Sequence, residues 1–590
     1  MNLGESILTA LTGYASFQEI WDGFLAYVPS LFTALVRIIL PVLAIWLLVR
    51  TARSLFAGKN EPEIWAWLVM NGDMKVPVKH WENVIGRGSS SDILLTLPTV
   101  SRSHAALIRD AAGNWTLTDL AGKHSLRLNG KTVEGSVPAR YGDVISVGGV
   151  EAVLTALSPE EAREQSDSRT KPGKLVSPVK SLFILCLFDL LLGTELALNT
   201  DHSQFPVIAL CFVWLLALMF LVYLLFRGMR RRAYEIETLA FFLSSLGLAV
   251  AASAGAHAMV KQTVAVTIGV AGFLILGLLL RNLQWVKALR WPVAGLALSL
   301  LLLTFLFGET IYGARNWLRI GSVSLQASEL VKVAFIFAGA ATLDRLFARR
   351  NLYSFILYAA AIVGALALMG DFGSASIFFV GFLMIAFLRS GDLATIALSC
   401  AGAGLAGFLA LTVKPYIANR FQAWRHVWEY AYSTGYQQTR TMVALASGGF
   451  LGLGAGKGWL HHVAAADTDL VFGLLSEELG LLIALSAVAS LIIAALFAVK
   501  TAYNARSTYY VIAACATGAI LVFQMMLNVC GSLDLLPLTG VTFPFVSNGG
   551  SSMISAWMML AYLKAADTRQ NASFAIPLPK FTRKAGRKNE

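Results

Sequence analysis

Long apolar runs separated by short polar connections make up most of the chain. Runs of about 18 residues or more recur from residue 180 onward, and one further run covers residues 28–49. Each run is long enough to cross a hydrocarbon layer of ~30 Å as an α-helix. The pattern predicts a polytopic α-helical membrane protein with about thirteen transmembrane helices. We place these helices at residues 28–49, 180–198, 205–226, 236–256, 263–280, 291–308, 329–344, 353–369, 373–388, 393–412, 470–498, 508–530 and 550–564.

Residues 64–157 have a different pattern. Short apolar segments alternate with polar positions, as in Trp115-Thr-Leu-Thr, and turn residues such as Asn129-Gly130 separate them. Short strands at regular spacing are typical of an all-β sandwich, and we predict one here. Residues 158–179 are polar and contain proline, which predicts a linker between the sandwich and the next apolar run.

Composition narrows the class further. Of the 590 residues 56% are hydrophobic and only 14% are charged, whereas a soluble domain carries about 25% charged residues. A soluble enzyme, a disordered regulator and a fibrous protein are therefore excluded. The net charge of +12 comes from basic residues between apolar runs and in the tail at 580–588, so we expect a membrane and no nucleic acid as partner. The five cysteines show no CxxC spacing and predict neither a disulfide framework nor a metal site.

The positions of the basic clusters predict the orientation in the plasma membrane. Lys and Arg resist translocation, so an odd number of spans puts the amino terminus outside and the basic tail in the cytoplasm. The β-sandwich is then cytoplasmic as well. We divide the chain into an N-terminal transmembrane anchor (1–60), the sandwich (64–157), the linker (158–179), two extra transmembrane helices (180–232), a helical core (235–565) and a basic cytoplasmic tail (566–590).

Four polar or glycine-rich segments interrupt the apolar pattern of the core. They cover residues 313–332, 370–374, 436–480 and 536–552. The predicted topology puts all four at or just inside the external face, where the long connection 413–468 also lies. Long connections in compact proteins are usually functional, and ionisable residues at membrane depth are functional candidates by default. The sequence therefore predicts an active cleft at the external face.

Together the four segments resemble the SEDS family, the shape, elongation, division and sporulation proteins that include RodA, FtsW and SpoVE. The resemblance rests on Gly313-Ala-Arg-Asn-Trp317, Gln326-Ala-Ser-Glu329, Thr468-Asp469-Leu-Val-Phe472 and Phe543-Pro-Phe-Val-Ser547. It covers residues 235–565, the ten-helix core of that family. It implies an inverting peptidoglycan glycosyltransferase that polymerises lipid II at the outer membrane face during division, elongation or sporulation. It also implies a class B penicillin-binding protein as partner.

The resemblance also implies catalytic roles. The family's indispensable carboxylate lies in the motif that here contains Asp469, so we predict Asp469 as the general base that removes a proton from the attacking sugar hydroxyl. Such a base contributes typically 10²–10⁴-fold. The departing diphosphate develops negative charge and requires cations nearby. The candidate cations are Arg315, Lys332 and Lys261.

Several candidate substrate-binding residues have alternative explanations. Glu329 and Lys332 are three residues apart on one predicted helix, so they can also form a buried ion pair without binding substrate. Asp371 can bind substrate or cap the helix that follows it. Ser547 belongs to the fourth segment and completes the predicted binding residues. Asp467 and Asp469 could together hold a divalent cation such as Mg²⁺ or Mn²⁺, the one cofactor that we hypothesise.

The predicted sandwich resembles the forkhead-associated (FHA) domain, which binds phosphothreonine peptides. The motifs are an arginine after a glycine at Arg87, Ser101 and His104 in one loop, and an Asn-Gly turn at Asn129. The resemblance implies that Arg87 and Ser101 bind phosphate, that His104 locks the loop, and that Asn129 belongs to the peptide site. His124 replaces the asparagine that grips the peptide in the family. The alternative is a sandwich that docks partners without phosphothreonine.

Two other functions remain open on the sequence. Many spans, a polar cavity and basic residues would equally suit a flippase or transporter of lipid-linked precursors. A non-catalytic scaffold of the division machinery that responds to phosphorylation is the third hypothesis.

Overall fold

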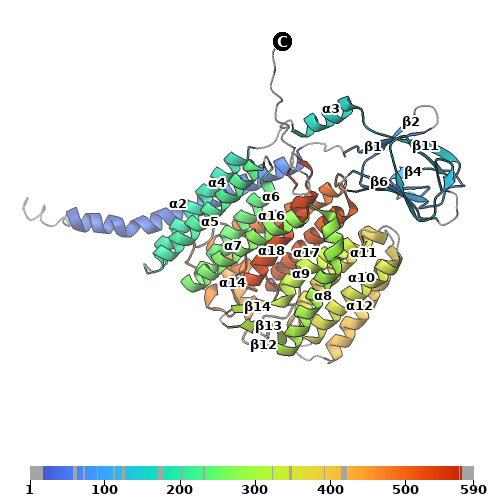
Figure 1. Ribbon diagram of the computed structural model, residues 1–590. Coiled ribbons are helices and arrows are strands. Elements are labelled where there is room, and N and C mark those ends of the chain that lie inside the picture. The colour runs from blue at the N-terminus through green and yellow to red at the C-terminus, as the bar shows by residue number, and fades with distance from the viewer. Residues whose placement is uncertain are drawn as a thin grey trace, which may run out of the picture.

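The computed structural model of the protein describes most of the chain. The described residues are 17–57, 63–70, 74–88, 91–110, 113–121, 126–170, 177–200, 203–229, 231, 233–311, 313–321, 323–343, 349–390, 393–413, 421–569 and 572–573. Most of the predicted basic tail, and His124 of the sandwich, lie outside these residues. A helical body and a β-sandwich at one end of it make up the fold (Figure 1).

The helical body is built from the predicted apolar runs. Its main helices are α2 (Phe17–Phe56), α4 (Pro178–Asn199), α5 (Phe205–Gly228), α6 (Glu235–Ser253), α7 (Ala256–Leu279), α8 (Leu283–Phe307), α9 (Ala327–Leu343), α10 (Arg349–Leu368), α11 (Phe372–Ser390), α12 (Leu393–Val413), α16 (Leu481–Ala502), α17 (Thr508–Ser532) and α18 (Gly550–Ala566). Within the described residues, nine helices are long and apolar enough to cross a membrane. The protein is therefore a multi-pass membrane protein. The other four, α9, α11, α12 and α18, coincide with the remaining predicted spans, and the total of about thirteen stays a prediction.

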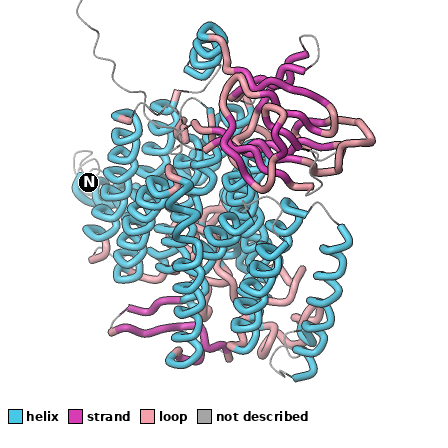
Figure 2. The backbone as a smooth tube through the Cα atoms, turned by 45° about the vertical axis from the view of Figure 1, so that its right-hand side comes forward, coloured by secondary structure: helices cyan, strands magenta, loops and turns pink. Residues whose placement is uncertain are grey.

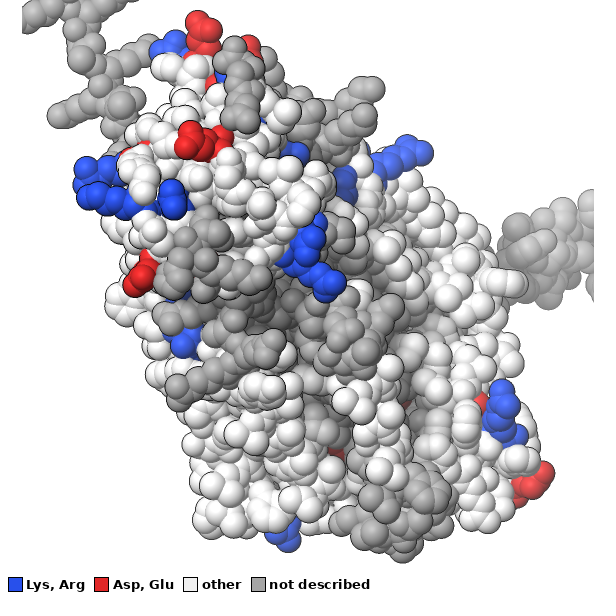
Figure 3. All heavy atoms as spheres, turned by 90° about the vertical axis from the view of Figure 1, so that its right-hand side faces the viewer, with Lys and Arg blue, Asp and Glu red and all other residues white. Residues whose placement is uncertain are grey.

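The surface of the helical body agrees with this class. On the face in Figure 3, charged atoms gather on the sandwich and toward the opposite end of the body, and the surface between them is largely uncharged. Inside the body, α17 packs on α11, α16 and α18, and α18 packs on α7 and α9. Trp557 and Tyr562 of α18 and Tyr509 of α17 are fully buried, so these two helices form the centre of the core.

The structure differs from the sequence prediction at three helical segments. The predicted span 470–498 is two helices, α15 (Val471–Glu478) and α16, because Gly480 between them has φ 91°. The connection 413–468 contains helix α14 (Tyr436–Gly448) and a short 3₁₀ turn, η1 (Leu460–His462). The predicted linker begins with helix α3 (Pro159–Thr170).

The sandwich consists of two sheets of short strands, as the alternating pattern predicts (Figure 2). One sheet has the order β2-β1-β11-β10-β7-β8, and the other has the order β4-β3-β5-β6-β9. Leu68, Leu107, Leu117 and Leu154 meet in its fully buried core. The strands are β1 (Ala66–Met70), β2 (Met74–Val78), β3 (Glu82–Gly86), β4 (Ile93–Leu94), β5 (Ala105–Arg109), β6 (Trp115–Asp119), β7 (Leu126–Leu128), β8 (Lys131–Thr132), β9 (Ser136–Ala139), β10 (Val144–Val147) and β11 (Val150–Thr155).

A small antiparallel sheet lies at the other end of the helical body. Its strands are β12 (Glu309–Ile311), β13 (Ala314–Ile320) and β14 (Val323–Gln326), in the order β12-β13-β14. It connects α8 to α9 and lies at the end opposite the sandwich (Figure 1). The first of the four polar segments is therefore far from the sandwich.

Candidate active site

The four polar segments are brought together by direct hydrogen bonds. Asn316 of the first segment donates through Nδ2 to Asp371 Oδ2 of the second at 3.1 Å. The amide of Gln326 donates to Ser551 Oγ of the fourth segment at 3.1 Å. The fourth segment contacts the third through Asn548, as described below. The convergence that the sequence predicts is therefore present in the structure.

Asp469 lies on a tight turn just before α15. Its amide donates to Ala465 O at 2.8 Å, and Ala465 has φ 60°, a conformation that a residue with a β-carbon rarely adopts. The Asp469 side chain is half-buried. Gly540 of the fourth segment faces it, because a β-carbon added there would lie 3.2 Å from Asp469 Oδ2. Gly540 also has φ 69°, so both backbone conformation and space favour glycine beside the carboxylate.

Two amide side chains of α17 hold the third and fourth segments. Asn528 donates through Nδ2 to Asp469 O at 3.0 Å and to Val541 O at 2.8 Å. Gln524 donates through Nε2 to the backbone oxygen of Thr542 at 3.0 Å and to its Oγ1 at 2.9 Å. Residues four apart lie on one helix face, so α17 fixes the Asp469 turn and the neighbouring loop from the same side. Neither residue was predicted from the sequence, because amides within an apolar run also bond to neighbouring helices.

Ser547 and Asn548 connect the fourth segment to the third. Ser547 Oγ donates to Thr468 O at 2.6 Å and accepts from the Phe543 amide at 2.7 Å. Asn548 donates through Nδ2 to Asp467 Oδ2 at 2.7 Å, and its amide donates to Asp467 O at 2.8 Å. Ser547 is 2% exposed, so in this structure it joins two loops.

Lys261 and Gln262 are neighbours on α7, and Gln262 contacts the fourth segment. Gln262 Nε2 donates to Ser547 O at 3.0 Å, while the adjacent Lys261 is exposed. Lys261 is therefore a surface cation one residue from a direct contact to the fourth segment.

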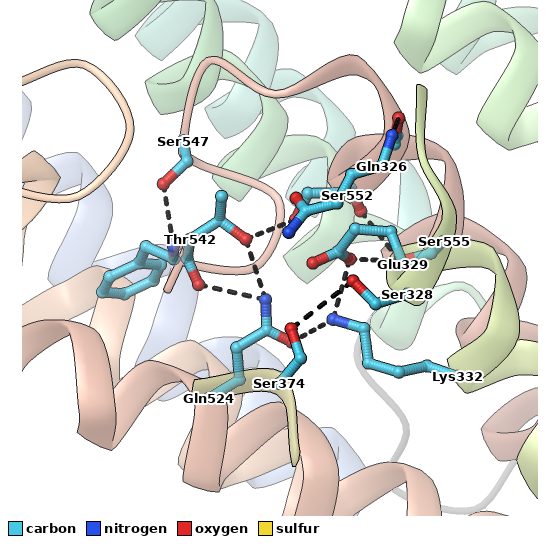
Figure 4. A network of polar contacts seen from close by, with 12 residues as sticks. Gln326, Ser328, Glu329, Lys332, Ser374, Gln524, Thr542, Ser547, Ser552 and Ser555 are labelled. Atoms are coloured by element: carbon cyan, nitrogen blue, oxygen red, sulfur yellow. Dashed lines mark hydrogen bonds and ion pairs between the residues drawn. The ribbon is translucent and has the colours of Figure 1, made fainter. Parts of the chain in front are cut away.

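Glu329 and Lys332 form a buried ion pair within a larger network (Figure 4). Lys332 Nζ lies 2.7 Å from Glu329 Oε2 and donates to Gln524 Oε1 at 2.6 Å. Ser555 Oγ of α18 donates to the same Glu329 oxygen at 2.9 Å. Glu329 is 4% exposed and Lys332 2%. The pairing that the sequence analysis gives as the alternative is thus present, and substrate binding by these two residues stays a prediction.

Asp371 and Arg315 lie on the other side of the same region. Asp371 Oδ1 accepts from the Ser374 amide at 3.0 Å, so it caps the first turn of α11. Arg315 is exposed, and its Nη1 donates to Phe305 O at 3.2 Å. Gly373 lies against the fourth segment, because its added β-carbon would lie 2.6 Å from a methyl group of Val541. The role of Arg315 in substrate binding stays a prediction.

The donor set for a divalent cation is small. The described residues hold no group of three His, Cys, Asp or Glu side chains that could bind a metal ion. Asp467 and Asp469 are both half-buried, and one oxygen of Asp467 already accepts from Asn548. A Mg²⁺ ion is commonly held by one or two carboxylates with water and substrate phosphate as its other ligands, so the chemistry of these two side chains suits that ion and the site stays a hypothesis.

The residues of the predicted phosphate site in the sandwich differ in their exposure. Arg87 is exposed and Ser101 half-buried, and the amide of Arg87 donates to Ser101 O at 3.0 Å. His104 is fully buried and its Nδ1 accepts from the Ser101 amide at 3.1 Å. His104 therefore shapes the loop, while Arg87 is accessible to a ligand.

Asn129 is engaged within the sandwich. Its Nδ2 donates to Asp143 Oδ1 at 2.8 Å, its Oδ1 accepts from the Val144 amide at 2.8 Å, and its φ is 51°. The hydrogen bond from Asn129, and after it the one from the Arg140 amide, lower the pKa of the Asp143 carboxyl. Asn129 therefore stabilises a turn in the structure, and its predicted contact with a peptide stays a prediction.

The fold and the site define a class of protein: a multi-pass helical membrane protein in which four polar segments that contain carboxylates meet, with an appended β-sandwich. Residues 233–572, more than half of the chain, match the family model of the FtsW/RodA/SpoVE cell cycle proteins, and residues 83–148 match that of the FHA domain. The chain therefore belongs to the FtsW/RodA/SpoVE family, and its sandwich is an FHA domain.

Individual relatives agree with this assignment. A probable peptidoglycan glycosyltransferase FtsW of Tolumonas auensis is 34% identical over 284 residues, which cover 46% of this chain and 73% of the relative. Another, from Buchnera aphidicola, is 29% identical over 294 residues, or 48% of this chain and 74% of the relative. Among solved structures, a peptidoglycan synthase complex matches 57% of this chain and 98% of its own at 25% identity, with a TM-score of 0.47. RodA of Thermus thermophilus matches at 25% identity over 57% of this chain and 97% of its own, with a TM-score of 0.42.

Proposed function

We propose that the protein is a peptidoglycan glycosyltransferase that polymerises lipid II into glycan strands, regulated by its FHA domain. Family membership supports the reaction class, since curated relatives carry this activity in their names. The observation that carries the mechanism is the geometry around Asp469. This half-buried carboxylate is held on a strained turn by Asn528 and lies against Gly540, where four separate segments meet.

In the proposed reaction Asp469 is the general base. Its carboxylate accepts the proton of the acceptor sugar 4-hydroxyl as that oxygen attacks the anomeric carbon of the donor. The new carbon–oxygen bond forms as the bond to undecaprenyl diphosphate breaks, and the electron pair of the broken bond leaves with the diphosphate. One displacement inverts the anomeric carbon, so no covalent sugar intermediate and no second nucleophilic carboxylate are required.

The leaving diphosphate needs positive charge, and we assign it first to exposed cations. Arg315 and Lys261 are exposed, whereas Lys332 is buried and contacts Glu329 and Gln524. Cations that become desolvated around a diphosphate stabilise its charge more strongly than they would in water. A Mg²⁺ or Mn²⁺ ion held by Asp467 and Asp469 would supply further charge there.

We infer that the Asp469 site faces the outside of the cell and that the FHA domain and the C-terminal tail face the cytoplasm. The support is the distribution of basic residues in the sequence, together with the location of the sandwich and of β12–β14 at opposite ends of the body (Figure 1). A class B penicillin-binding protein is the proposed partner on the outer side. A phosphothreonine protein is the proposed ligand of the FHA domain, through Arg87 and Ser101.

Polymerisation by purified protein tests the proposal. In proteoliposomes that contain lipid II, we expect wild-type protein to form glycan polymer and Asp469→Asn to lose about 10²–10⁴-fold in rate. Asp534→Asn is the matched control, because Asp534 lies beyond the end of α17 and its carboxylate caps the amide of Arg425 at 3.0 Å. Lipid transport across the bilayer without polymer would favour the flippase, and neither activity in a protein that supports growth would favour the scaffold.

A further inference from the structure

The FHA domain contacts the helical body at the turn between α16 and α17. Arg506 of this turn forms a bidentate ion pair with Glu63, with Nε–Oε2 at 2.7 Å and Nη2–Oε1 at 3.1 Å. Its guanidinium carbon lies 5.1 Å from the ring centre of Trp65. Arg506 is only 5% exposed. Bidentate, planar contacts of this kind fix orientation as well as distance.

Glu82 of β3 completes the start of α17. Its carboxylate accepts from Ser507 Oγ at 2.9 Å and from the amide of Thr508 at 3.1 Å. Ser507 is itself the N-cap residue of α17. A helix begins with amides that lack partners within the helix, and its N-terminus favours negative charge. The FHA domain therefore supplies part of the N-terminal cap of a core helix.

Backbone contacts complete the same surface. The Trp81 amide donates to Arg506 O at 2.7 Å, and His80 Nδ1 lies 3.1 Å from Ala505 O. We call the set formed by Glu63, Trp65 and His80–Glu82 with residues 505–508 the joint. A flexible tether would not require a buried ion pair, whose desolvation opposes its formation. The joint therefore fixes the sandwich to the first turn of α17.

One strand links the joint to the predicted phosphate site. β3 begins at Glu82 in the joint, and Arg87 follows its last residue. The strand also holds the loop that contains Ser101 and His104, which we call the phosphate loop, because Ile85 O accepts from the His104 amide at 2.9 Å. Five residues of strand span roughly 17 Å. A shift of the phosphate loop is thus transmitted to Glu82 by a short element of a packed sheet.

One helix links the joint to the Asp469 site. α17 begins at Thr508 in the joint, and Gln524 and Asn528 near its other end hold the Asp469 turn and the loop from Val541 to Thr542. From Thr508 to Asn528 the helix rises about 30 Å. A movement of the first turn of α17 would change the orientation of the face that carries Gln524 and Asn528. It would also change the packing of α17 on α11, α16 and α18.

We propose that the joint energetically couples ligand binding at Arg87 of the FHA domain to the geometry of the Asp469 site through β3 and α17. This inference rests on the proposed function. Coupling between two sites is reciprocal, and typical couplings change affinity by 5- to 150-fold. Such coupling is carried by chains of packed elements that have two discrete arrangements, and β3, the joint and α17 form one contiguous chain of contacts between the two sites.

Hydrogen exchange of the full chain in lipid nanodiscs tests the coupling without any ligand. Glu82→Gln replaces a carboxylate with an amide whose NH₂ cannot accept from Thr508 or Ser507. We expect exchange of the amides between residues 536 and 549 to rise at least about fivefold. Glu151→Gln is the matched control, since Glu151 is an exposed carboxylate of the same domain outside the joint. Arg506→Lys keeps the charge and removes the bidentate contact, so it should give an intermediate change even if Glu82→Gln folds poorly. Faster exchange confined to residues 503–512 would overturn the coupling.

A second arm uses a peptide library with one fixed central phosphothreonine. A peptide selected on the full chain should change the wild-type polymerisation rate at least about fivefold, and should bind Glu82→Gln without changing its rate. An unchanged peptide effect in Glu82→Gln would contradict the proposal. If no peptide binds wild-type protein, the phosphothreonine assignment is wrong, and if no polymer forms, the glycosyltransferase assignment is wrong. In both cases the exchange experiment still decides the role of the joint.

Discussion

The buried ion pair of Glu329 and Lys332 leads to a prediction about stability and activity together. Lys332→Met would leave the Glu329 carboxylate, which is 4% exposed, with the Ser555 hydroxyl as its side-chain hydrogen-bond donor among the described residues. Removing one partner of a buried pair costs about 3–5 kcal/mol, which is roughly a 10²- to 10⁴-fold change in the folding equilibrium. We expect a matching loss in the free energy of unfolding, measured by denaturant titration in lipid bicelles.

The double variant Glu329→Gln with Lys332→Met separates the two explanations of the pair. Replacing both charges in a buried pair is often neutral or stabilising, so the double variant should recover most of the stability. Wild type, the two single variants Glu329→Gln and Lys332→Met, and the double variant form a double-mutant cycle. We expect the recovered protein to polymerise lipid II, because Lys332 is engaged by Glu329 and Gln524. A stable double variant without activity would show that Lys332 acts on the diphosphate. A Lys332→Met protein as stable as wild type would refute the reasoning about the pair itself.

Three further predictions concern single side chains. Asn528→Asp removes the donor that holds the Asp469 turn, which should cost about 1–3 kcal/mol of stability and lower kcat more than KM; lost binding with an unchanged kcat would contradict a positioning role. Gly540→Ala should reduce the polymerisation rate if Asp469 is the general base, since the added methyl group would lie 3.2 Å from the Asp469 carboxylate at a φ of 69°; wild-type activity would argue against that close approach. Hydrogen bonds, first of all the one from Asn129, lower the pKa of the Asp143 carboxyl in the folded protein. Their contribution to stability is therefore fully present above the pKa of this carboxyl in the unfolded chain, and it is lost as the pH falls through the folded pKa. Asn129→Ala should therefore destabilise the sandwich at pH 7 and flatten this acid dependence, as measured by hydrogen exchange of β7 and β10; equal acid dependence in both proteins would contradict the assignment.

The helices were predictable because length and apolarity alone determine membrane crossing. The break at Gly480 was missed, although Ser476, Glu477 and Glu478 interrupt the apolar pattern just before it. The backbone shows the break directly, because the glycine has φ 91°. Helix α3 had a local signal that the composition of the linker obscured. The Ser158 hydroxyl accepts from the Glu161 amide at 3.1 Å and the Glu161 carboxylate accepts from the Ser158 amide at 2.8 Å, which is a capping box at the expected spacing.

Some features of the candidate site were also predictable from the sequence, and others were not. Convergence of the four segments follows from the parity of the spans between them, which the sequence contains. The partner of Lys332 within its own helix, Glu329, follows from their spacing. Gln524 and Asn528 could not be assigned to a site from one sequence, because an amide in a membrane helix more often bonds to a neighbouring helix. Their role depends on two loops that are distant in sequence and meet only in the fold.

The N-terminal helices contact the third polar segment by a route separate from the joint. Asn199 of α4 donates through Nδ2 to Ala455 O at 2.9 Å, and a β-carbon added at Gly454 would lie 2.6 Å from Thr33 Cγ2 of α2. These contacts hold the glycine-rich part of the third segment, yet α2 and α4 precede the residues matched by the family model, 233–572. Deleting the N-terminal portion would therefore remove both the FHA domain and a direct support of the active region. Loss of activity in such a truncation would not demonstrate regulation, because the loss of the FHA domain and the loss of the contacts from α2 and α4 would each explain it. Point variants at Glu82 distinguish the two, since Glu82 contacts the first turn of α17 and lies in the FHA domain, outside α2 and α4.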